Sequence, residues 1–141
     1  MNNSLKENSA YAAWTIAVAG MIGSLYFSEI RNFPPCILCW YQRIALYPLV
    51  AIIAVGIVRK DKNLPYYVLP LSIIGGAIAF YHNLLYYNII SGSIIPCTLG
   101  ISCTTKFVEY FGFVTIPLLS FSSFVAITIL MLVYKNYLKS K

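Results

Sequence analysis

Charged residues are scarce in this sequence of 141 residues, where aspartate, glutamate, lysine and arginine together make up only 10%. Hydrophobic residues make up 60%, and the mean hydropathy is +0.76. A typical soluble domain carries about 25% charged residues and is less apolar. The composition therefore excludes an ordinary soluble domain and indicates an integral membrane protein.

Four hydrophobic segments are long enough to cross about 30 Å of hydrocarbon as helices, which takes roughly 20 residues each. They cover residues 11–27, 37–58, 66–90 and 115–134. The first carries Lys6 on its amino side and shows no small-x-small cleavage site, so we expect a retained span rather than a removed signal peptide. The sequence thus predicts an all-α membrane protein, a single integral membrane domain over residues 1–141. Its architecture is a four-helix transmembrane bundle with short extracytoplasmic loops.

Lysine and arginine are distributed unevenly around these segments. The basic residues that precede the first segment, connect the second to the third or follow the fourth are Lys6, Arg59, Lys60, Lys62, Lys135, Lys139 and Lys141. The opposite connections carry mainly Arg31 and Lys106, offset by Glu29 and Glu109. By the positive-inside rule, both termini are cytoplasmic and all four cysteines face the outer, disulfide-permissive side. The net charge of +6 is then a topology signal, and no nucleic-acid partner is expected.

A C-x-x-C motif, Cys36 and Cys39, stands at the start of the second segment, directly after Pro34 and Pro35. Proline is tolerated in the first helical turn, so we expect a helix to begin here. Free N–H groups and the helix dipole at such a start favour a thiolate. Arg43 follows one helical turn beyond the second cysteine. This placement predicts electron chemistry at a membrane surface.

Other interpretations of the motif have less support. With only four cysteines and one histidine in apolar surroundings, half of a zinc site is disfavoured, and no resident metal is expected. Covalent haem attachment requires a histidine where Trp40 follows Cys39. Two incidental core cysteines are the remaining alternative.

A second cysteine pair, Cys97 and Cys103, lies between the third and fourth segments in a stretch rich in turn-forming residues. Gly100 lets this stretch fold back on itself, so an internal disulfide is sterically feasible. This disulfide could be a permanent structural one that ties the stretch down. Exposed disulfides tend to be labile or catalytic, and a C-x-x-C motif is expected on the same face, which favours thiol exchange.

Aromatic residues follow the second pair at helical spacing, namely Phe107, Tyr110 and Phe111. They fit a helix lying along the outer membrane surface. They fit equally well an aromatic belt that leads into the fourth segment. The two alternatives stay open.

Arg43 and His82 are the only ionisable side chains well inside the predicted spans, tyrosines apart. Arg43 lies roughly 10 Å along its helix, and His82 precedes the outer end of the third span by a similar length, so we expect both at one depth. An ionisable residue inside a membrane marks a functional site by default. Snorkelling of Arg43 to the interface and simple packing of His82 are the alternatives.

The electron acceptor is indicated partly by what is missing. The sequence has no glycine-rich nucleotide fingerprint and no haem motif, and its connections are too short to build a soluble cofactor domain. An acceptor dissolved in the bilayer remains, and quinones are the obvious class. The same lack of extramembrane chain indicates that substrate proteins arrive through a separate soluble carrier.

The run Cys36-x-x-Cys39-x-Tyr41-Gln42-Arg43 resembles the signature of the DsbB family of disulfide bond formation proteins. The small size and the tight second cysteine pair are most similar to the BdbC branch. The likeness covers nearly the whole chain, with four spans, cysteine pairs in both outer loops and a histidine in the third span.

This resemblance implies a protein-dithiol:quinone oxidoreductase in a bacterial plasma (inner) membrane. Its partners would be the lipid bilayer, a membrane quinone (menaquinone or ubiquinone) and a DsbA-like (BdbD-like) thioredoxin-fold thiol oxidase. Arg43 and His82 would hold the quinone.

The resemblance also implies an order of thiol exchange through two redox-active disulfides, Cys36–Cys39 and Cys97–Cys103. The reduced partner would attack the second disulfide, first at Cys97. Cys36 would then exchange with Cys103, and Cys39 would pass electrons to the quinone. Larger family members spread the second pair across a longer loop, so the pairing order, and which of the two cysteines meets the partner, stay open.

Two rival functions make different predictions. A thiol-rich small metal-binding or metal-transport membrane protein predicts metal in the purified protein and thiols that resist disulfide formation. A non-enzymatic helical subunit with structural disulfides predicts that loss of a cysteine lowers only protein abundance.

Overall fold

The structure is a computed structural model that describes residues 2–32, 34–90, 109–110 and 114–139. Its main elements are the helices α1 (Asn2–Leu25), α2 (Ile37–Arg59), α3 (Leu64–Tyr86) and α4 (Ile116–Lys139). Segments long and apolar enough to cross a membrane are Glu7–Ile30, Ile37–Arg59, Leu64–Tyr86 and Ile116–Lys139. The predicted all-α class with four transmembrane helices is confirmed.

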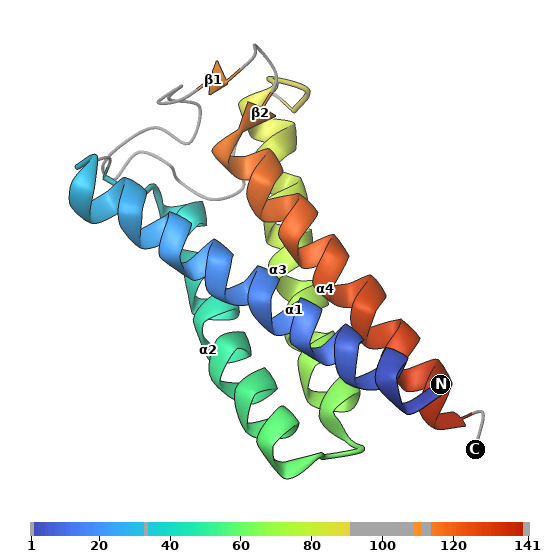
Figure 1. Ribbon diagram of the computed structural model, residues 1–141. Helices are drawn as coiled ribbons and strands as arrows, with labels where there is room; N and C mark the ends of the chain where they lie inside the picture. The colour runs from blue at the N-terminus through green and yellow to red at the C-terminus, as the bar shows by residue number, and fades with distance from the viewer. Residues whose placement is uncertain (1, 33, 91–108, 111–113, 140–141) are drawn as a thin grey trace.

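The four helices pack as a ring in which α1 and α3 each contact both α2 and α4. The start of α1 and the end of α4 lie at one end of the bundle, together with the short connection between α2 and α3 (Figure 1). We call this the terminal end. The opposite end, where α2 begins after Cys36, is called the cysteine end.

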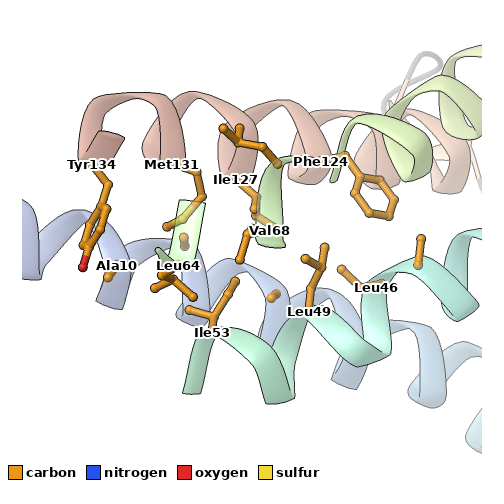
Figure 2. Close-up of a cluster of buried hydrophobic side chains, with 14 of the residues drawn as sticks. Ala10, Leu46, Leu49, Ile53, Leu64, Val68, Phe124, Ile127, Met131 and Tyr134 are labelled. Carbon is orange, nitrogen blue, oxygen red and sulfur yellow. The ribbon is translucent and has the colours of Figure 1, made fainter. Parts of the chain in front are cut away.

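Apolar side chains from all four helices fill the bundle interior. Those with no exposed surface include Ala13, Ala17, Leu49, Ile53, Val68, Ile127 and Met131. Figure 2 shows the side chains of α4 pointing toward those of α2 and α3. The buried residues of α1 in this cluster are alanines, and such small side chains let helix backbones approach closely.

A stripe of buried residues along α3 determines which face of this helix turns toward the bundle interior. Ser72, Gly75, Ala79 and His82 follow one another at spacings of three or four, so they share one helix face. Gly75 brings α3 close to α4, because a Cβ there would lie 2.4 Å from Cε1 of the buried Phe124. Ser72 Oγ donates to the Phe124 carbonyl oxygen at 3.1 Å. The same face that packs on α4 therefore carries His82 into the bundle.

The helix α3 ends at Tyr86, whereas the sequence predicted that this span continues to residue 90. Asn88 adopts a left-handed backbone with φ of 54°. The N–H groups of Asn88 and Ile89 then reach back to the carbonyl oxygens of Leu85 and Leu84, at 3.1 and 3.0 Å. Asparagine tolerates this conformation and commonly ends helices in this way.

The first helix also differs from its predicted limits, since α1 begins at Asn2 and continues into a π-helical turn, η1 (Tyr26–Ile30). Arg31 N–H donates to the Tyr26 carbonyl oxygen at 3.2 Å, which is the i to i+5 bond of a π-helix. Such turns are rare and occur frequently at functional sites. The turn lies at the cysteine end, beside the site described below (Figure 1).

Two short strands precede α4. The strand β1 (Glu109–Tyr110) pairs antiparallel with β2 (Val114–Thr115). The alternative of a surface helix through Tyr110 is therefore wrong at Glu109 and Tyr110. Backbone pairing with β2 replaces the helical hydrogen bonds there.

Candidate thiol redox site

The cysteines of the C-x-x-C motif are neighbours at the start of α2. Cys36 has an extended backbone and occupies the N-cap position, as Pro34 and Pro35 predict. Its carbonyl oxygen accepts a hydrogen bond from Trp40 N–H at 3.1 Å. Cys39 follows one turn later, and the two Sγ atoms lie 3.1 Å apart as free thiols. The pair is therefore placed to close a disulfide by local movement.

His82 of α3 reaches the cysteine pair from across the bundle. Its Nε2 atom lies 3.8 Å from Cys36 Sγ, although 46 residues separate them in sequence. The ligand atoms of His82, Cys36 and Cys39 all lie within 4.8 Å of one another, a group that could also hold a metal ion. The sequence predicted that His82 lies at the same depth as Arg43, but it did not predict the contact between His82 and Cys36.

Gln42 completes the contact between α2 and α3. Its side-chain Nε2 atom lies 3.0 Å from Nδ1 of His82, and both side chains are buried. Gln42 stands three residues after Cys39, so the two share one face of α2. The sequence analysis quoted Gln42 only as part of a motif. Its position on the cysteine face was the signal that could have assigned it to the site.

Arg43 joins α2 to the junction of α1 and η1. Its Nη2 atom donates to the Ser24 carbonyl oxygen at 2.9 Å and to the Ser28 hydroxyl. Its guanidinium carbon lies 5.6 Å from the centroid of the Trp40 ring. Arg43 is thus half-buried and held by specific contacts with two other segments.

A cavity of about 400 Å³ connects these residues at the cysteine end. Its walls are mostly apolar and come from α1, η1, α2, α3 and α4 together with the segment before α2. The polar and ionisable groups on its walls include Ser24, Ser28, Cys36, Cys39, Gln42, Arg43, His82, Tyr86, Ser120 and Ser123. Four of the predicted site residues, Cys36, Cys39, Arg43 and His82, therefore meet at one cavity.

Cys36 precedes the membrane-spanning part of α2, and its surroundings favour the thiolate. The hydrogen bond with Cys39 lowers the pKa of Cys36 most, and the hydrogen bond with His82 lowers it further. Burial opposes both effects. The net direction is downward, which is typical of a reactive rather than a structural cysteine.

The second cysteine pair, Cys97 and Cys103, lies outside the described residues. Its predicted disulfide and its approach to Cys36 stay predictions. The described part of the site contains the Cys36–Cys39 pair, the cavity and the groups that surround them.

Comparison with known proteins decides the family. A family model described as "Disulfide bond formation protein DsbB" matches residues 6–134. The chain belongs to the DsbB family. The family resemblance inferred from the C-x-x-C motif is thereby confirmed, and the role of the chain is that of a thiol oxidoreductase in disulfide bond formation. With its four apolar helices, this family member is a multi-pass membrane protein.

Relatives cover almost the full length of the chain. "Disulfide bond formation protein C" of Bacillus subtilis (strain 168) is 46% identical over 126 residues, which are 89% of this chain and 91% of the relative. "Probable disulfide formation protein C 2" of Bacillus anthracis is 47% identical over 127 residues, covering 90% and 89%. "Probable disulfide formation protein" of Metapseudomonas resinovorans is 37% identical over 130 residues, covering 92% and 90%. No solved structure matches the chain.

Proposed function

We propose that this protein reoxidises a DsbA-like (BdbD-like) extracytoplasmic thiol oxidase and passes the electrons to a membrane quinone. The observation that carries the proposal is the apolar cavity at which the Cys36–Cys39 pair, Arg43 and His82 meet. Such a cavity gives a dithiol access to an apolar molecule. A structural disulfide or a simple helical subunit needs no such cavity.

The cavity suits a quinone by size and by chemistry. A quinone is a planar apolar ring with two carbonyl oxygens, and it accepts two electrons and two protons to become a hydroquinone. Mostly apolar walls favour the ring, and a volume of about 400 Å³ falls within the usual range for small-molecule pockets. Arg43 and His82 supply N–H donors for carbonyl oxygens. Small or apolar residues of α1 and α4, such as Gly23 and Leu119, line the side where the cavity adjoins these two helices.

The cysteines supply the electrons in this proposal. Closing the Cys36–Cys39 disulfide releases two electrons and two protons, the number that reduction of one quinone consumes. Arg43 lies one helical turn beyond Cys39 on the same face of α2, which places its positive charge beside the dithiol. That charge would stabilise negative charge developing at a bound quinone oxygen during electron transfer.

Exchange with the partner is assigned to the second pair. In this proposal the reduced partner opens the Cys97–Cys103 disulfide, and Cys103 then exchanges with Cys36. In this proposal both termini are cytoplasmic and the cysteine end faces outward, where such a partner operates. The basic residues at the terminal end support that orientation. A membrane-impermeant thiol reagent should then label the cysteines in intact reduced cells, and labelling that requires lysis would contradict this orientation.

The direct test is quinone reduction by the purified protein. The protein in detergent, given a reduced thioredoxin-fold partner, should reduce added ubiquinone or menaquinone, followed by the change in quinone absorbance. Cys39→Ser should abolish the reaction. Arg59→Ala, at the exposed end of the same helix, is the matched control and should leave the rate unchanged. Bound metal in the purified protein, with thiols that resist oxidation by quinone, would support the metal-binding rival instead.

A further inference from the structure

We infer that Gln42 is a positioning residue that fixes the tautomer of His82, so that the ring presents Nε2–H to Cys36 Sγ and stabilises the Cys36 thiolate. The inference deepens the proposed function, because it assigns a role within the same site. The tautomer of His82 can be tested in the absence of a quinone or a partner protein.

The hydrogen-bonding capacity of the amide decides the tautomer. The Gln42 Nε2 atom carries two hydrogens and has no acceptor capacity. At 3.0 Å from Nδ1 it must therefore donate to that atom, which accepts with its lone pair. A neutral imidazole then carries its proton on Nε2.

The protonated nitrogen faces the cysteine. His82 Nε2 lies 3.8 Å from Cys36 Sγ, within reach of a hydrogen bond to sulfur. Gln42, His82 and Cys36 are only 6%, 3% and 8% exposed, so these contacts lie away from bulk solvent. Burial also makes an unpaired polar group costly, which holds the three groups in one arrangement.

The cavity lining around the ring is poor in ionisable groups. The ionisable groups that line the cavity around it are Cys36, Cys39 and Arg43 on the α2 side and Tyr86 on α3. The lining residues of α1, η1 and α4 that the structure describes are apolar residues, glycines and serines. No aspartate or glutamate belongs to the described lining, so no carboxylate there competes with Cys36 for the Nε2–H group. In the tautomer that Gln42 favours, the ring can donate to a thiolate directly.

The consequence lies in the exchange step of the proposed function. When the Cys97 thiolate attacks Cys103 in a Cys36–Cys103 mixed disulfide, the Cys97–Cys103 bond forms and the Cys36–Cys103 bond breaks. The electron pair of the broken bond stays on Cys36 Sγ. A donor at 3.8 Å stabilises that leaving thiolate, and a more stable thiolate leaves faster. Gln42 thus acts on the reaction through His82.

The single histidine of this chain permits a direct test. Protein labelled with ¹⁵N-histidine in detergent should show one imidazole, with Nε2 protonated and Nδ1 unprotonated by long-range ¹H–¹⁵N NMR. Gln42→Met keeps the side-chain size but removes the donor, so both tautomers should become populated. Gln42→Glu supplies an acceptor, so the proton should move to Nδ1. Wild-type protein with the proton on Nδ1, or a Gln42→Met spectrum identical to wild type, would overturn the inference.

A second measurement reports the thiolate itself. In a Cys39→Ser/Cys97→Ser/Cys103→Ser background, the rate of Cys36 alkylation by iodoacetamide is followed against pH. Adding Gln42→Met should raise the midpoint by about one pH unit, a tenfold change in the thiolate fraction. Ser122→Ala, which removes an exposed hydroxyl of α4 away from the site, is the control and should leave the midpoint unchanged. An unchanged midpoint with Gln42→Met would contradict the inference, whereas failure to reduce quinone would contradict only the proposed function.

Discussion

Arg43 on α2 donates a hydrogen bond of 2.9 Å to the carbonyl oxygen of Ser24, near the end of α1. The same guanidinium nitrogen donates to the hydroxyl of Ser28 in η1. A charged side chain is thus fixed at the cavity wall by two helical segments, and its orientation depends on both. This arrangement leads to separate predictions for the arginine and for the residues that hold it.

Replacing Arg43 should impair quinone binding more than thiol exchange. Arg43→Ala removes the cation beside the proposed quinone position, so the apparent KM for quinone should rise about tenfold or more, roughly 1.4 kcal/mol per tenfold. Arg43→Lys should restore little of the lost quinone binding. The planar guanidinium can donate to several acceptors at once, and an ammonium cannot reproduce that geometry. Steady-state kinetics with quinone and partner varied separately, and Arg59→Ala as control, measure the effect. A defect confined to the partner titration would move Arg43 out of the quinone site.

Ser28→Ala should have a smaller effect of the same kind. The substitution removes one of the two oxygen atoms that hold Arg43 but leaves the Ser24 carbonyl in place. A net hydrogen bond contributes about 0.5–1.5 kcal/mol, so the KM for quinone should rise roughly two- to tenfold with little change in the partner titration. Ser122→Ala is the matched control, since that exposed hydroxyl bonds only to Leu119 within α4. Equal kinetics for the two variants would show that Ser28 does not position Arg43.

Loss of any one cysteine should stop turnover without preventing insertion. Cys36→Ser, Cys39→Ser, Cys97→Ser and Cys103→Ser each remove one link of an exchange chain, and such a chain fails when any link is missing. The partner should then accumulate in its reduced form, as shown by alkylation and gel shift in cells. Immunoblots of the membrane fraction control for abundance. Normal turnover in a Cys97→Ser/Cys103→Ser protein would show that the second pair is structural or dispensable.

Neighbouring glycines of α3 should respond differently to alanine. A Cβ at Gly75 would lie 2.4 Å from Cε1 of the fully buried Phe124, so Gly75→Ala should destabilise the bundle by about 1–3 kcal/mol. A Cβ at Gly76 would lie 3.5 Å from Phe124 Cβ, an ordinary contact. Gly76→Ala should be neutral or up to about 1 kcal/mol stabilising, because alanine favours helix. Thermal unfolding in detergent compares the two, and equal midpoints would contradict the packing of α3 on α4.

Much of this fold followed from composition and local sequence. Hydropathy predicted four spans because a bilayer demands long apolar helices, and Pro34 and Pro35 predicted the start of α2. The end of α3 was missed because Asn88, which ends the helix in a left-handed conformation, stands within a run of apolar residues. The π-helical turn η1 was missed because nothing in its sequence distinguishes i to i+5 from ordinary helical bonding.

The site was predictable only where residue chemistry is distinctive. Cysteine, arginine and histidine are rare inside apolar helices, so Cys36, Cys39, Arg43 and His82 were identified from sequence. The contact between Cys36 and His82 depends on how α3 is rotated against α2, which packing around the α3 stripe decides. Gln42 was not assigned to the site because an amide is neither ionisable nor redox-active. Its role becomes visible only through its hydrogen bond with His82.

The central claim is that the Cys36–Cys39 pair passes its electrons directly to a quinone. The most direct measurement is a single anaerobic turnover of the fully reduced protein mixed with ubiquinone or menaquinone in the absence of any partner. Acid quenching and alkylation count the thiols, and absorbance counts the hydroquinone. The account predicts one hydroquinone for each Cys36–Cys39 disulfide formed, and no hydroquinone in Cys39→Ser. Retention of both free thiols while quinone is present in excess, or hydroquinone formed equally well by Cys39→Ser, would contradict it.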